Sequence, residues 1–177
     1  MNQIFFITGV NGVGKSAIMP YLITMLPSKD FDVRDFDERG VPERADKQWR
    51  ISETQHWINE GIALLQANKC LVICGFVKPA DFQDIPKREG LKIILALLDA
   101  QPEIIRQRLM RRYSHKGNFN ESQTVIGKPI KDFIDGNIYT RGQLKKTFEE
   151  LKYSIVDTTH LTPEEVARAV ANILLKE

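Results

Sequence analysis

The sequence predicts an α/β protein in which helices cover both faces of a parallel sheet. Five short apolar runs alternate with longer stretches of helical character; they cover residues 4–8, 31–36, 70–74, 92–98 and 154–156. Strands that alternate with helices in this way are typical of parallel sheets with crossover connections. The first, third and fourth runs are apolar throughout, as expected for strands buried on both faces. The run at 31–36 also carries charges, which favours an edge position or a strand with functional groups.

Length and composition indicate one globular domain over residues 1–177, and a chain of this size buries roughly 70% of its unfolded surface. The 25 basic and 23 acidic residues leave a net charge of only +2, so we expect neither nucleic acid nor a membrane as partner. The first residues lack the basic segment of an export signal, which predicts a cytoplasmic protein. Cys70 and Cys74 share one predicted strand, where their Cα atoms would be about 13 Å apart, too far for a disulfide.

The helical stretches carry signals of their own. Apolar side chains between residues 43 and 67 recur at helical spacing on one face. Pro102 opens a predicted helix that reaches residue 112, and a Thr-Pro-Glu-Glu capping box at 162–165 opens the last helix. Residues 113–128 are polar and contain glycine, which predicts a mobile loop. Gly136 and Gly142 are expected to split the helical stretch that follows.

One motif indicates the chemistry. Residues 9–16 read Gly-Val-Asn-Gly-Val-Gly-Lys-Ser and match the pattern G-x-x-x-x-G-K-[ST], here called the P-loop, between a predicted strand and a predicted helix. Its glycines allow backbone N–H groups to point into a concavity, and the helix start adds partial positive charge, so phosphate oxygens are held from several directions. In this motif Lys15 reaches the β- and γ-phosphates and the Ser16 hydroxyl binds Mg²⁺. We therefore expect ATP and Mg²⁺, with nucleotide contacts from Gly9, Asn11, Gly12, Val13, Gly14, Lys15 and Ser16.

Other sequence features narrow the class of P-loop protein. The guanine-reading NKxD and the LSGGQ signature are missing, and the third strand ends Ile73-Cys74-Gly75 without a water-activating glutamate. The pattern resembles the nucleoside-monophosphate-kinase-like group, which includes adenylate, shikimate and gluconate kinases. The resemblance implies a three-layer P-loop fold with strand order 2-3-1-4-5 and a short lid, for which residues 113–128 are the candidate. It also implies an acceptor-binding helical segment at about 38–68.

Two acids follow the second predicted strand. Asp35-Phe36-Asp37 looks like the D-x-D of shikimate and gluconate kinases, and alternate residues of a strand share a face. The resemblance implies that Asp35 holds Mg²⁺ through water and that Asp37 binds the acceptor hydroxyl and accepts its proton. The reverse assignment fits the spacing equally well, and an ordinary acidic surface turn is a further interpretation.

Three more patches carry the resemblance. Gly75 is similar to the glycine that ends this strand in shikimate kinases and implies close approach of the substrate, although a plain turn glycine also fits. Arg108 and Arg112 lie four residues apart, as in the R-[LI]-x-x-R segment before the lid of adenylate and gluconate kinases. This implies Arg108 against adenine and Arg112 on the transferring phosphates; a solvated basic helix is the alternative. The turn at 157–160 resembles the one that borders adenine.

The sequence gives the least information about which acceptor is bound. Four cations lie near Trp49 in the sequence, namely Arg39, Arg44, Lys47 and Arg50, which suggests an acceptor with an anionic group and a flat ring. Neighbouring acids could instead pair with these cations on a solvated helix, with Trp49 in the core. A nucleoside or nucleotide fits the pattern, and so does a carboxylated sugar acid.

These observations predict an ATP-dependent small-molecule kinase, a monomer or homodimer, with Lys15, Asp37 and Arg112 as catalytic residues. Two other functions fit the same motifs. One is a phosphotransferase that modifies an antibiotic or a nucleotide sugar. The other is a nucleotide-binding regulatory module without an acceptor.

Overall fold

The computed structural model describes residues 2–43, 45–83, 85–86, 89–113, 124–125 and 127–176. Its main sheet has five parallel strands: β1 (Gln3–Thr8), β2 (Phe31–Asp35), β3 (Cys70–Cys74), β4 (Lys92–Asp99) and β7 (Ser154–Asp157). Their order across the sheet is β2-β3-β1-β4-β7, which is 2-3-1-4-5 when only these five are counted. The predicted α/β class and strand order are confirmed.

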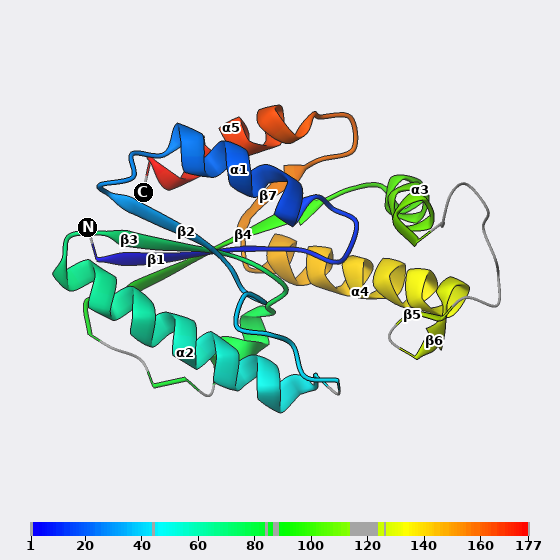
Figure 1. Cartoon of the computed structure of the whole chain (residues 1–177), viewed down its shortest axis with the longest axis horizontal. Helices are drawn as coiled ribbons and strands as arrows, with labels where there is room; N and C mark the ends of the chain where they lie inside the picture. The colour runs from blue at the N-terminus through cyan, green and yellow to red at the C-terminus, as the bar shows by residue number, and fades with distance from the viewer. Residues whose placement is uncertain are drawn as a thin grey trace.

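Helices cover both faces of the sheet (Figure 1). They are α1 (Lys15–Met25), α2 (Lys47–Gln66), α3 (Pro102–Tyr113), α4 (Ile130–Glu150) and α5 (Pro163–Leu174), with a short 3₁₀ helix, η1 (Pro79–Phe82). Side chains alternate along each buried strand. In β1, Phe5 and Ile7 pack with α1 and α5, whereas Ile4 and Phe6 pack with α2 on the opposite face. Two separate apolar clusters therefore hold the three layers together.

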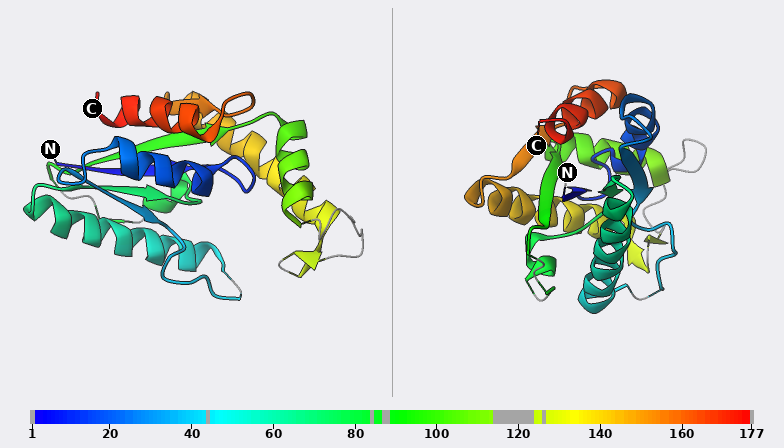
Figure 2. Two further views of the ribbon diagram at one scale, coloured as in Figure 1. Left: turned by 45° about the horizontal axis from the view of Figure 1, so that its top comes forward. Right: turned by 90° about the vertical axis from the view of Figure 1, so that its left-hand side faces the viewer.

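The helix α4 is continuous from residue 130 to 150, so the prediction that glycines split it is wrong. Its start is buried through Phe133 and Ile134, and its end through Leu144 and Phe148. Between them, Arg141 forms a two-pronged ion pair with the buried Asp99 of β4, with both N–O distances 2.6 Å. Packing and this ion pair outweigh the weak helix propensity of glycine. Figure 2 shows α3 and the start of α4 beyond the carboxyl ends of the strands.

Most of the predicted lid, 113–128, lies outside the described residues. Two short antiparallel strands, β5 (Thr124–Val125) and β6 (Lys128–Pro129), occur where the sequence predicts a loop. Both cysteines are buried and free, as expected. Among the described helices, none combines the length and the apolar character needed to span a membrane.

Candidate active site

The P-loop connects β1 to α1 at the carboxyl edge of the sheet. Gly14 caps the N-terminus of α1 with a φ of 107°, a left-handed conformation that glycine adopts readily. Lys15 is the first residue of the helix, and its Nζ donates to the carbonyl oxygens of Gly9 (2.6 Å) and Val10 (3.1 Å). The lysine side chain thus lies along its own loop.

The environment of Lys15 favours an anionic partner. Burial lowers the pKa of Lys15 to about 8, and the negative charge of Asp37 is the largest influence that opposes this shift. Arg112 lowers the pKa further by its positive charge. A phosphate group would offset the burial of the lysine charge, because it brings opposite charge to a site that lacks enough of it.

The two aspartates of D-x-D flank a buried aromatic residue. Phe36 is only 1% exposed and packs edge-on against Trp49, with ring centroids 5.9 Å apart, while Trp57 donates from Nε1 to the Phe36 carbonyl oxygen at 3.1 Å. Asp35 Oδ1 accepts from the backbone N–H of Asp37 at 2.9 Å. The core packing of Phe36 therefore fixes where both carboxylates lie.

The pKa of Asp37 departs from the ordinary value of a carboxyl group. Its pKa is raised above the ordinary carboxyl value, first by partial removal from water and then by the negative charge of Asp35. Lys15 opposes the shift. A carboxylate with a raised pKa is a stronger base, which suits proton abstraction.

One pocket of about 370 Å³ brings most of the predicted site residues together. This loop pocket is lined by Asn11, Gly12, Gly14, Lys15, Ser16, Ala17, Asp35, Asp37, Cys74, Gly75, Phe76, Arg108 and Arg112. The P-loop, both aspartates, Gly75 and both arginines therefore face one space. The resemblance to adenylate, shikimate and gluconate kinases implied this grouping, although the residues come from four separate segments.

Gly75 follows β3 at the floor of the loop pocket. A Cβ atom there would lie 2.0 Å from Cβ of Phe36, so no larger residue fits without moving the D-x-D segment. The φ of Gly75 is not in the left-handed range, and its N–H donates to the Ile7 carbonyl oxygen at 3.0 Å. Close packing, and not a turn conformation, is therefore the reason for glycine at this position.

Arg108 joins the P-loop to the C-terminal turn. Its guanidinium donates to the Gly12 carbonyl oxygen at 3.3 Å and to the Thr158 Oγ1 and carbonyl oxygen at 3.1 and 2.8 Å. Thr158 Oγ1 in turn donates to the Val13 carbonyl oxygen at 2.9 Å. Arg112, one helical turn further along α3, lines the loop pocket and lies 5.7 Å from the centre of the Tyr113 ring.

A second, mostly apolar pocket of about 240 Å³ adjoins the first on the side of α5. This C-terminal pocket is lined by Val13, Gly14, Ala17, Ile18, Arg108, Thr158, Leu161, Pro163 and Val166. It shares Gly14, Ala17 and Arg108 with the loop pocket. The turn predicted to border adenine thus contributes Thr158 to a mostly apolar pocket beside the P-loop.

Of the cations predicted for the acceptor, the structure describes Arg39, Lys47 and Arg50, and these line none of the three pockets described here. Arg50 forms a two-pronged ion pair with the fully buried Asp81 of η1, at 2.6 and 3.0 Å. Lys47 is exposed, and Arg44 lies outside the described residues. Trp49 packs against Phe36 as part of the core. Of the two interpretations of this segment, the one in which acids pair with the cations fits Arg50, although its partner is a carboxylate distant in sequence and not a neighbouring acid.

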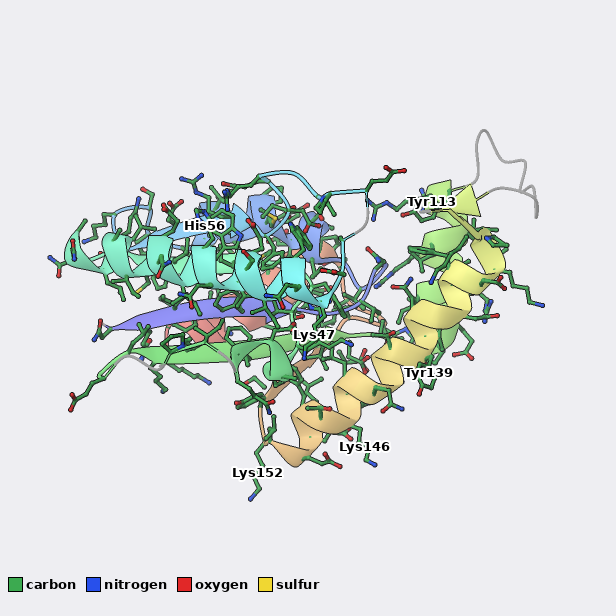
Figure 3. The ribbon with its side chains drawn as sticks, turned by 90° about the horizontal axis from the view of Figure 1, so that it is seen from below. Lys47, His56, Tyr113, Tyr139, Lys146 and Lys152 are labelled. Carbon is green, nitrogen blue, oxygen red and sulfur yellow. The ribbon has the colours of Figure 1, made fainter. Side chains whose placement is uncertain are left out.

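A third pocket, of about 400 Å³, lies between the P-loop and α4, and sequence reasoning missed it. This α4 pocket is lined by Val10, Asn11, Phe76, Lys128, Asp132, Phe133, Gly136, Asn137, Tyr139 and Thr140. It shares Asn11 and Phe76 with the loop pocket. The spacing of Asp132, Gly136 and Thr140, four residues apart, was a sequence signal for a polar helix face. In Figure 3, the helix α4, which carries Tyr139, runs obliquely from the sheet toward Tyr113 of α3. The helix α2, which begins at Lys47, lies in front of the sheet in this view.

The donor set fits Mg²⁺ better than a metal held by protein alone. Among the described residues, no group of three or more His, Cys, Asp or Glu side chains could hold a metal ion. The loop pocket offers the Ser16 hydroxyl and the two D-x-D carboxylates. Mg²⁺ is commonly held by one or two carboxylates together with water and phosphate oxygens, so these residues fit it.

Comparisons with known proteins agree with this architecture. No protein-family model and no curated protein matches the sequence. An unliganded sugar kinase from Janibacter sp. is similar in structure, with a TM-score of 0.61, 16% identity, and 98% of this chain and 95% of that chain covered. Shikimate kinase from Acinetobacter baumannii, solved with shikimate, gives a TM-score of 0.59 at 15% identity over 99% and 94%. The chain thus has the fold of the P-loop small-molecule kinases.

Proposed function

We propose that the protein transfers the γ-phosphoryl group of ATP to a hydroxyl group of a small molecule. The observation that carries this proposal is the continuity of the three pockets, in which each shares lining residues with the next. The C-terminal pocket takes the base, the loop pocket takes the phosphates, and the α4 pocket takes the acceptor. Donor and acceptor therefore meet beside Asn11 and Phe76.

The chain's own residues supply positioning and charge. P-loop N–H groups and Lys15 hold the β- and γ-phosphates, and Arg112 offsets negative charge that spreads over the transferring group. Asp37 accepts the proton of the acceptor hydroxyl, a role that its raised pKa supports. Arg108 fixes the P-loop against the C-terminal turn and borders the base. Mg²⁺, bound by Ser16 and through water by Asp35, would neutralise phosphate charge.

The acceptor is best described as a nucleoside or nucleotide, and the pockets favour the neutral nucleoside. Phe76 and Phe133 offer rings to a flat base, and Asn137 and Thr140 offer hydrogen bonds. The charged lining residues of the α4 pocket are one of each sign, Lys128 and Asp132. Gly75 lines the loop pocket and leaves room for Phe36 of the D-x-D segment, and Lys47 lines none of the three pockets. Any role for Arg44 would come from outside the described residues.

ADP release from Mg-ATP tests the proposal. The panel contains nucleosides, their 5′-monophosphates, sugar acids and neutral aromatic alcohols of the antibiotic type, with Lys15→Ala as the matched blank. Stimulation by one class in the wild type, and not in Lys15→Ala, supports a kinase and identifies the acceptor. Full activity in Lys15→Ala contradicts the proposal. ATP binding without product from any acceptor would favour the regulatory module.

A further inference from the structure

A pair of asparagine side chains ties the P-loop to α4. Asn137 Oδ1 accepts from the backbone N–H of Asn11 at 3.1 Å and from Asn11 Nδ2 at 3.3 Å. The amide of Asn137 has a defined orientation, because its Nδ2 donates to the Phe133 carbonyl oxygen at 2.8 Å. Residues 126 positions apart in the sequence are thus joined by two hydrogen bonds.

The helix that presents Asn137 is itself firmly held. One turn further along, Arg141 pairs with the buried carboxylate of Asp99, and Lys145 adds a contact of 3.4 Å to the same carboxylate. One turn earlier, Phe133 is buried in the core. Asn137 therefore reaches the P-loop from a helix fixed on both sides, and it can hold Asn11 in one position.

The Asn11–Asn137 pair lies where two of the pockets meet. Asn11 lines both the loop pocket and the α4 pocket, whereas Asn137 lines only the α4 pocket. If phosphates occupy the first pocket and the acceptor the second, the group that is transferred passes between them beside Asn11. The N–H groups around Gly14 and the start of α1 would then hold the α- and β-phosphates.

We propose that Asn137 is a positioning residue for the terminal phosphate: it holds Asn11 so that the P-loop fits three phosphates better than two. The inference rests on the proposed function and deepens it. It assigns to α4 a direct part in nucleotide recognition, in addition to its part in lining the acceptor space. The consequence is that a change at Asn137 affects ATP more than ADP, even without an acceptor.

The test compares two nucleotides in three proteins. Binding of Mg-ADP and of the non-hydrolysable Mg-AMPPNP is measured by calorimetry for the wild type, Asn137→Ala and Gln143→Ala. Gln143 is an exposed amide on the same helix and lines none of the three pockets, so it is the matched control. We expect Asn137→Ala to weaken AMPPNP about five- to tenfold, the size of a lost hydrogen bond, and ADP less than twofold. Gln143→Ala should change neither.

A second variant at the same position, Asn137→Asp, distinguishes a specific effect on the terminal phosphate from a general disturbance of the structure. Asn137→Asp keeps an oxygen that can accept from Asn11 but adds negative charge near the terminal phosphate, so AMPPNP should lose at least tenfold more affinity than ADP. Equal losses for both nucleotides in Asn137→Ala and Asn137→Asp, or no loss in either variant, would overturn the inference while leaving the proposed function in place. A wild-type protein that binds neither nucleotide would overturn the proposed function and the inference together.

Discussion

On the P-loop side of the site, Lys15 and Arg112 face the loop pocket without an ion-pair partner among the described residues, whereas on the α2 side Arg39 and Arg50 are held in ion pairs. Lys15 donates to two carbonyl oxygens and Arg112 lies over a tyrosine ring, and within the described part of the chain neither forms an ion pair. Arg50, by contrast, is paired with Asp81, and Arg39 with Glu53 at 3.2 Å. The first side is prepared for an anion and the second is not.

This difference suggests how the protein could distinguish the nucleotide from the acceptor. Under the proposed function, phosphates would meet unpaired cations and N–H groups, so the donor side would select for charge. The α4 pocket would select the acceptor by amides, hydroxyls and ring faces, because no arginine is among its lining residues. A neutral acceptor would then not compete for the phosphate site.

The largest expected effect concerns the proton acceptor. Asp37→Asn should lower kcat by about 10² to 10⁴-fold, because the amide cannot take a proton, and should leave ADP affinity within about twofold. Steady-state kinetics and calorimetry on the same preparation measure both. Because the pKa of Asp37 is raised, wild-type kcat should fall on the acid side at a higher pH than an ordinary carboxyl would give. Loss of Mg-nucleotide binding instead would assign the metal to Asp37 and the proton to Asp35.

A stability effect comes next and tests the paired side. Asp81→Asn leaves the Arg50 guanidinium, only 16% exposed, without its counter-charge. Removing one partner of a buried pair costs about 3–5 kcal/mol, so urea unfolding should show a loss of that size. Arg168→Ala breaks an exposed pair on α5 and should cost less than about 1 kcal/mol. Similar losses in both variants would mean that the Arg50–Asp81 pair stabilises the fold no more than an exposed ion pair does.

A pH effect tests the unpaired side. Phosphate binds best to protonated Lys15, and the pKa of this lysine is lowered to about 8. Mg-ADP affinity should therefore be constant below about pH 7, be halved near pH 8 and be about tenfold lower by pH 9, where roughly one lysine in ten keeps its proton. In Lys15→Arg the affinity should stay flat over this range, because arginine is not deprotonated. A flat profile in the wild type would contradict the lowered pKa.

The donor side could be predicted because its residues are adjacent in sequence. Gly9 to Ser16 form one loop whose mechanism depends on local conformation, and Arg108 and Arg112 share a helix face by spacing alone. The strands β1, β3 and β4 could be predicted for a similar reason, because strands buried on both faces are apolar throughout. The strands β2 and β7 could be predicted only from the alternation of strands and helices along the chain. Sequence patterns were therefore sufficient to predict those parts of the site whose residues lie close together in the sequence.

The acceptor side could not be predicted because its contacts are distant in sequence. Several acids near Arg50 were candidate partners, but the actual one, Asp81, follows the next strand, 31 residues away. The α4 pocket needs the P-loop and α4 side by side, which only the folded sheet provides. The continuity of α4 was missed because propensity at Gly136 and Gly142 favours a break, whereas packing at Phe133 and Phe148 decides the outcome.

The smallest expected effect separates the two glycines of α4. A methyl group at either position would meet nothing within 4 Å, so Gly142→Ala should raise the free energy of unfolding by about 0.5–1 kcal/mol. Gly136→Ala should raise it by the same amount, but Gly136 lines the α4 pocket, where the methyl group takes up acceptor space. The KM for the acceptor should then rise in Gly136→Ala alone, with ADP affinity equal in both variants. A rise in KM in Gly142→Ala would mean that acceptor binding depends on the stiffness of α4 and not on the volume of the α4 pocket.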